Sequence, residues 1–107
     1  MSQLMQGNAY KLFVAELDKH LEAIDSILTN SELSEEDMSR LAAKFHTIRG
    51  GAGFFALTDI SKYAEALEEF FNEQWTQFNE QYDWIVDTLS QLKSAASKIP
   101  RVKDEPV

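Results

Sequence analysis

Apolar side chains recur every three or four residues along most of the chain. The first such seam runs from Tyr10 to Leu28, with charged residues on the other positions. Similar seams follow at residues 38–52, 60–71 and 78–99. This spacing places the apolar residues of each stretch on one face of a helix. The pattern therefore predicts four amphipathic helices joined by short turns, that is, an all-α antiparallel four-helix bundle with up-down-up-down topology.

Local signals predict where these helices begin and end. Ser34 and Asp37 have the spacing of a capping box, which predicts a helix start near residue 35. Thr58 is the predicted N-cap of the third helix, and Pro100 stops the fourth because proline has no backbone N–H. We expect residues 1–99 to form the bundle domain and residues 100–107 to form a flexible tail or the start of a linker.

The amino-acid composition of the chain excludes several classes of function. The chain has 107 residues, a formal net charge of −8 and no cysteine. Disulfide scaffolds, iron–sulfur clusters and cysteine-based zinc sites are therefore excluded. The excess of acidic over basic residues disfavours nucleic acid as a partner. The absence of a long apolar run disfavours a membrane-spanning segment. The N-terminus lacks the pattern of a signal peptide, so a cytoplasmic protein is expected.

The second predicted helix carries an unusual cluster of glycines. Three of the four glycines in the chain are Gly50, Gly51 and Gly53. Each glycine inside a helix costs about 0.5–1 kcal/mol relative to alanine, so the cluster calls for a compensating role. His46 lies one turn earlier and is rotated by about 100° from its apolar neighbour Phe45, at the edge of the buried face. A protein surface could approach the imidazole across this strip of small residues.

The surroundings of His46 are also locally basic. Residues 38–64 contain four cations and one anion, although the chain as a whole is acidic. A cation at Arg49, one turn from the imidazole, would favour a phosphoryl group on the ring.

Residues 46–57, HTIRGGAGFFAL, closely resemble the motif of histidine-containing phosphotransfer domains. That motif has a histidine, two residues, a lysine or arginine, and then glycine and small residues. The doubled glycine is most similar to the N-terminal phosphotransfer domain of CheA-type chemotaxis histidine kinases. The resemblance extends to the helices before and after the motif.

The resemblance implies a phosphocarrier in two-component signalling. His46 would accept a phosphoryl group from a histidine kinase catalytic domain or a receiver. It would pass the group to an aspartate of a response-regulator receiver domain. Arg49 matches a family lysine near the phosphoryl group, and Glu68 matches a glutamate beside the histidine, with Glu65 as a second candidate. The carrier would need no cofactor of its own, since Mg²⁺ would be supplied at the kinase or receiver.

These residue types suit the implied chemistry. A carboxylate that accepts a hydrogen bond from Nδ1–H fixes the tautomer and leaves Nε2 free to attack phosphorus. Two positions depart from the family pattern: Arg49 replaces the commoner lysine, and Ala56 stands where the CheA-type turn has glycine. No glycine-rich nucleotide loop is present, so these residues are not expected to phosphorylate themselves from ATP. Either a free-standing carrier or part of a CheA-type kinase fits this pattern.

Other interpretations remain open at this stage. The main alternative is a non-catalytic bundle for protein–protein interaction, with an inactive histidine. His20 is interpreted as a histidine at the bundle edge, and two histidines on different helices do not support a zinc site. Side chains flanking the glycines are candidates for partner contacts, with Phe54 and Phe55 as a possible exposed apolar pair. The candidate contacts are Lys44, Gly50, Gly53 and Phe54.

Overall fold

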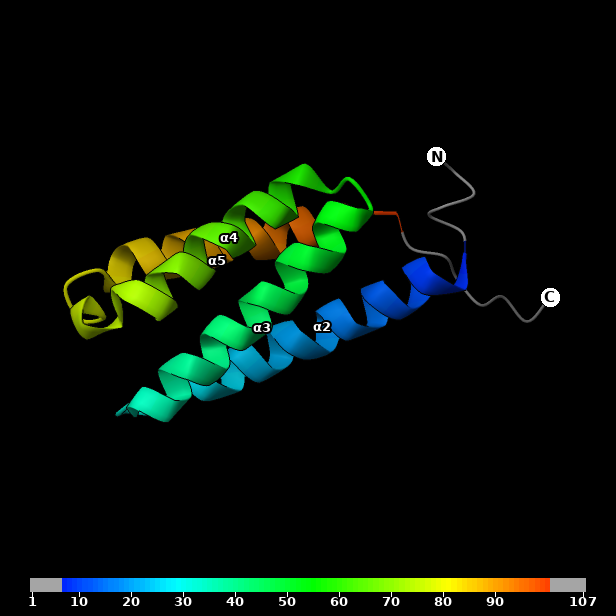
Figure 1. The fold of residues 1–107 in the computed structure, drawn as a ribbon. Coiled ribbons are helices and arrows are strands. Elements are labelled where there is room, and N and C mark those ends of the chain that lie inside the picture. Colours follow the sequence, from blue (N-terminus) through cyan, green and yellow to red (C-terminus); the bar gives the residue numbers. More distant parts are fainter. Residues whose placement is uncertain (1–6, 101–107) are drawn as a thin grey trace.

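The computed structural model describes residues 7–100 and has four α-helices in that range. They are α2 (Asn8–Leu28), α3 (Glu35–Phe54), α4 (Thr58–Glu73) and α5 (Tyr82–Ser97), with a short 3₁₀ helix η1 (Trp75–Gln77) before α5. Successive helices run in opposite directions, and the described residues contain no strand (Figure 1). The predicted all-α antiparallel four-helix bundle is therefore confirmed.

The apolar faces of all four helices meet in one core. Helix α3 lies between α2 and α4 and packs most closely against α4 (Figure 1). At the centre of that contact the rings of Phe45 and Phe71 are stacked 5.8 Å apart. Eleven large side chains in the bundle are almost fully buried, and this packing, more than helix propensity, holds helices of this length together. The outer faces of α3 and α4 remain available for a site.

The start of α3 follows the predicted capping box. The Ser34 hydroxyl accepts a hydrogen bond from the Asp37 amide, and an Asp37 carboxylate oxygen accepts one from the Ser34 amide, each at 3.0 Å. These bonds satisfy two backbone donors that a helix start leaves free. The boundary near residue 35 is thus confirmed.

The turn between α3 and α4 corrects a second predicted cap. The Leu57 amide donates to the carbonyl of Ala52 at 2.8 Å, and the Ala56 amide donates to that of Gly53 at 3.1 Å. These two bonds form a Schellman motif, which closes the C-terminus of α3. Leu57 consequently occupies the N-cap position of α4 and provides no side-chain cap. The prediction of Thr58 as N-cap is wrong, because the closure of α3 makes Thr58 the first helical residue.

Ala56 occupies the left-handed position of this turn, with φ of +60°. An L-residue with a side chain pays about 1–2 kcal/mol in this conformation, whereas glycine does not. Glycine also has more freedom to lose on folding, at about 0.5–1 kcal/mol. We therefore predict that Ala56→Gly raises the free energy of unfolding by about 0.5–1 kcal/mol, measured by urea denaturation. Ala15→Gly on the exposed face of α2 is the matched control and should lower it; destabilisation by Ala56→Gly would contradict the argument.

The fourth helix begins later than its apolar seam predicted. Phe78 was expected to lie in that helix, but it follows η1, and α5 starts only at Tyr82. Phe78 nevertheless packs half-buried against the core, with its ring 6.3 Å from that of Phe71. Its apolar character reflects packing of the loop rather than a helical turn, so the assignment of Phe78 to the seam of the fourth helix is wrong.

Two further expectations concern the ends of the chain and membranes. None of the helices within residues 7–100 is long and apolar enough to cross a membrane. Helix α5 ends at Ser97, and the Pro100 carbonyl accepts a hydrogen bond from the Tyr10 hydroxyl of α2. Residues 101–107 of the predicted tail lie outside the described residues, so the division at residue 99 stays a prediction.

Candidate functional site

His46 lies on the outer side of α3, next to the core. Its neighbour Phe45 is buried, whereas the His46 side chain is 63% exposed. Consecutive residues of a helix are rotated by about 100°, and this rotation brings the imidazole out of the bundle while its backbone stays in a rigid helix. The predicted position of the histidine at the edge of the buried face is confirmed.

Glu68 of α4 joins His46 and Arg49 of α3. One oxygen of its carboxylate, Oε2, lies 2.8 Å from His46 Nδ1, and the other, Oε1, accepts a hydrogen bond from Arg49 Nε at 2.7 Å. The Glu68 side chain is only 15% exposed, whereas those of His46 and Arg49 are 63% and 37% exposed, so the carboxylate is the shielded member of both contacts. The close packing of α3 on α4 therefore brings together the three residues that the sequence motif singled out.

We assign the Nδ1–H tautomer to His46 from its contact with Glu68. An ionised carboxylate only accepts hydrogen bonds, so the proton between Glu68 and His46 belongs to Nδ1. A terminal nitrogen of Arg49 also lies 3.1 Å from Nδ1, but a guanidinium only donates and cannot bond a nitrogen that carries hydrogen. We interpret that contact as a close approach. Nε2 then has the free lone pair on an exposed ring.

Arg49 lies beside both members of this pair. Its guanidinium donates to Glu68 and approaches Nδ1 of His46, and its implied place near the phosphoryl group stays a prediction. In this arrangement Arg49 positions Glu68, and Glu68 positions His46. Glu65, the second carboxylate candidate, lines the same hollow as Arg49 and Glu68, but the carboxylate that reaches the imidazole is Glu68.

The three glycines of α3 have different surroundings. A Cβ at Gly51 would lie 2.5 Å from Phe13 Cδ1, so Gly51 allows α2 and α3 to approach each other. A Cβ at Gly50 would meet nothing within 4 Å, and one at Gly53 would be 3.8 Å from the Ser61 hydroxyl. Helix packing thus accounts for Gly51, a contact that no local sequence pattern revealed, and leaves Gly50 and Gly53 as an open strip beside His46.

The other candidate contact residues divide between surface and core. Phe54 is 68% exposed, but Phe55 is buried, with its ring 5.2 Å from that of Tyr10 and 5.4 Å from that of Phe13. The predicted exposed pair is therefore wrong for Phe55, because the turn directs it into the core. Lys44 is half-exposed on α3.

His20 lies half-buried on α2 beside α3, at the bundle edge as predicted. Burial lowers the pKa of its imidazole, and the nearby positive charge of Lys44 lowers it further, with Glu16 opposing the shift. His20 is thus held in its neutral form more strongly than a free histidine.

A four-helix bundle with an exposed histidine beside a partly buried carboxylate is the architecture expected of a phosphocarrier domain. A family model for the Hpt domain matches residues 8–97, which includes all four helices. The chain belongs to the Hpt, or histidine-containing phosphotransfer, domain family, whose members transfer phosphoryl groups in phosphorelay signalling. Comparison with curated proteins found no match, and comparison with solved structures found none either. The finer resemblance to CheA-type domains stays a sequence-based prediction, as does a role in chemotaxis.

Proposed function

We propose that this domain carries a phosphoryl group on Nε2 of His46 between a histidine kinase and the receiver domain of a response regulator. The observation that supports the proposal most directly is the 2.8 Å contact between Glu68 and Nδ1. An ionised carboxylate at this position favours the tautomer with the proton on Nδ1, which leaves the lone pair of Nε2 free. The alternative, a bundle with an inactive histidine, offers no reason for this arrangement.

Phosphoryl transfer to His46 exchanges one bond at phosphorus for another. The lone pair of Nε2 forms the N–P bond, and the bond between phosphorus and the donor oxygen breaks, with its electron pair leaving on that oxygen. The imidazole ring becomes positively charged while Nδ1 keeps its proton. The Glu68 carboxylate beside Nδ1–H stabilises this charge. In the return step an aspartate oxygen attacks phosphorus, and the N–P pair goes back to Nε2.

The partners supply what the carrier lacks. The nucleotide site would belong to the kinase catalytic domain. The Mg²⁺ that neutralises the phosphoryl oxygens would be held at the kinase or at the receiver. We place both reactions in the cytoplasm, where such kinases and receivers meet. Lys44, Gly50, Gly53 and Phe54 are the proposed partner contacts.

The proposal is tested by phosphorylating the purified domain with a small phosphoramidate donor and, separately, with a phosphorylated receiver domain. Intact mass is measured at neutral pH and again after mild acid. We expect one phosphoryl group, stable at neutral pH and lost in acid, as for a P–N bond on histidine. A domain that stays unmodified by the small donor, with its helical content intact, would overturn the carrier role.

Glu68→Gln tests the orientation of the imidazole. A glutamine amide can accept from Nδ1–H or donate to Nδ1, so it no longer selects the tautomer with a free Nε2. It also removes the negative charge beside the positively charged phosphohistidine ring. We predict phosphorylation of His46 about 10–100-fold slower than in the wild type, by analogy with the loss when the partner that orients a metal-ligating histidine is removed. The measurement is the initial rate with the phosphoramidate donor.

Glu65→Gln is the matched control, because Glu65 lies one turn away on the same helix face. We expect this variant to react within about twofold of the wild type. Equal slowing of the two variants would contradict the assignment of Glu68, since a general loss of negative charge would then explain the effect.

A further inference from the structure

Two hollows lie on opposite sides of α3, and each is lined by neighbours of His46 rather than by His46 itself. The first lies between α2 and α3, and Thr47, which follows His46, is part of it. The second lies between α3 and α4 and contains Glu68, which contacts His46. We call them the basic hollow and the acidic hollow. The basic hollow is lined by His20, Arg40, Ala43, Lys44 and Thr47. The acidic hollow is lined by Arg49, Glu65, Glu68, Glu69, Asn72 and Glu73.

The basic hollow presents positive charge from α3. Arg40 is 58% exposed at its side chain and has only a long ion pair, 3.4 Å, with Asp37. Lys44 has no ion pair with any residue of the described range 7–100. Burial lowers the pKa of His20 on α2, and the positive charge of Lys44 lowers it further, whereas Glu16 on α2 raises it. A negative group that approached here would meet Lys44, which has no ion pair within residues 7–100, and Arg40, whose ion pair with Asp37 is long and exposed.

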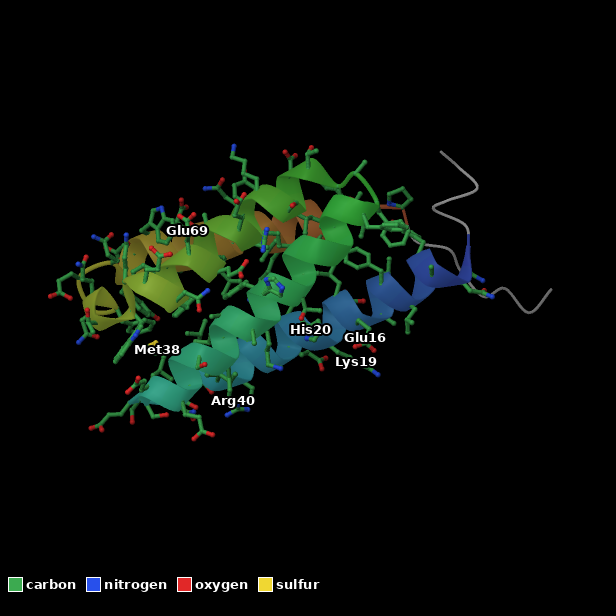
Figure 2. All side chains as sticks on the ribbon, in the orientation of Figure 1. Glu16, Lys19, His20, Met38, Arg40 and Glu69 are labelled. Carbon is green, nitrogen blue, oxygen red and sulfur yellow. The ribbon has the colours of Figure 1, made fainter. Side chains whose placement is uncertain are left out.

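The acidic hollow has the opposite character. Glu68 is neutralised by its ion pair with Arg49, but Glu65, Glu69 and Glu73 remain on the exposed side of α4. Lys62, one turn before Glu65, offsets part of this charge. Figure 2 shows the separation: Arg40 and His20 lie along the α2 side of α3, and Glu69 lies on α4 at the other side.

A receiver domain presents negative charge at the point of transfer. Its phosphoryl acceptor is an aspartate, and Mg²⁺ is held there by oxygen ligands, mostly carboxylates. The carrier has a net charge of −8, so the two proteins repel each other over most of their surfaces. Contact at a locally positive surface avoids this repulsion and directs the encounter.

Building on the proposed carrier function, we propose that the receiver docks on the α2 side of His46, with the acidic rim of its acceptor pocket over the basic hollow. The acidic hollow lies outside the contact. Arg40 and Lys44 are then specificity-determining residues that select and orient an acidic partner, and His20 forms the far wall of the docking surface.

The test uses domain that has been phosphorylated with the small phosphoramidate donor, so that no protein partner is needed for loading. The second-order rate of transfer is measured with the receiver domain that reacts fastest with the wild type. Arg40→Glu/Lys44→Glu reverses the charge of the basic hollow. Glu69→Lys/Glu73→Lys is the matched reversal in the acidic hollow. Circular dichroism verifies the fold, and Arg40→Gln/Lys44→Gln replaces the first variant should it not fold.

We expect Arg40→Glu/Lys44→Glu to slow transfer about tenfold or more at low salt. The difference should nearly vanish at 1 M salt, where the Debye length is only about 3 Å. Glu69→Lys/Glu73→Lys should transfer as fast as the wild type or faster. Transfer at the wild-type rate by the first variant, or slowing by the second alone, would overturn the proposed docking side. Failure of the wild type to become phosphorylated would instead refute the carrier function itself.

Discussion

His46→Gln is expected to abolish phosphorylation completely while leaving the bundle folded. Glutamine has no imidazole nitrogen to form the N–P bond, and no other histidine lies near Glu68 within residues 7–100. The side chain is 63% exposed, and Glu68 keeps its ion pair with Arg49. The free energy of unfolding should therefore change by less than about 0.5 kcal/mol, as is usual at surface positions. Intact mass before and after mild acid measures the first effect, and urea denaturation measures the second.

His20→Gln is the matched control, because it removes the only other histidine of the chain. This variant should take up one acid-labile phosphoryl group as the wild type does. Phosphorylation that persists in His46→Gln, or that is lost in His20→Gln, would show that the acceptor has been assigned to the wrong residue.

Alanine substitutions at Gly50 and Gly51 should change stability in opposite directions. A Cβ at Gly51 would lie 2.5 and 2.6 Å from two atoms of the Phe13 ring. That ring cannot move freely, because Tyr10 and Phe55 pack against it. Such overpacking costs about 1–3 kcal/mol, more than the helix propensity that alanine contributes. Gly51→Ala is therefore predicted to destabilise the domain.

Gly50→Ala should instead stabilise it by about 0.5–1 kcal/mol, since the added methyl group meets nothing within 4 Å. Urea denaturation midpoints with an unchanged slope give both values. A shift of both variants in the same direction would contradict the contact with Phe13. A double-mutant cycle with Phe13→Ala provides an independent check, because removing the ring should relieve most of the penalty at Gly51.

The sequence alone determined the class of fold and the centre of the site. Four seams of apolar residues at helical spacing predict four helices, each with one apolar face. A helical bundle buries all four of these faces in one core. The histidine, the arginine three residues later and the glycines were identifiable because they lie on one helix, where sequence spacing translates directly into position.

Local patterns were less reliable where one element decides the geometry of the next. Thr58 has the chemistry of an N-cap, but the Schellman closure of α3 placed Leu57 there. Phe78 continues the apolar seam of the fourth helix, yet it packs from a loop. Phe54 and Phe55 are candidates for an exposed apolar pair in the sequence, but the turn between α3 and α4 buries Phe55. In each case long-range packing or turn closure outweighed a local preference.

The tertiary structure decided how the site is assembled and charged. The contact of Glu68 with His46 joins residues 22 positions apart in sequence, and only the packing of α4 on α3 establishes its 2.8 Å distance. The location of Arg49 on the Nδ1 side, the role of Gly51 against Phe13 and the division of charge between two hollows have the same origin. Sequence spacing specifies which side chains share a helix face, whereas the distance and charge between faces depend on how the helices pack.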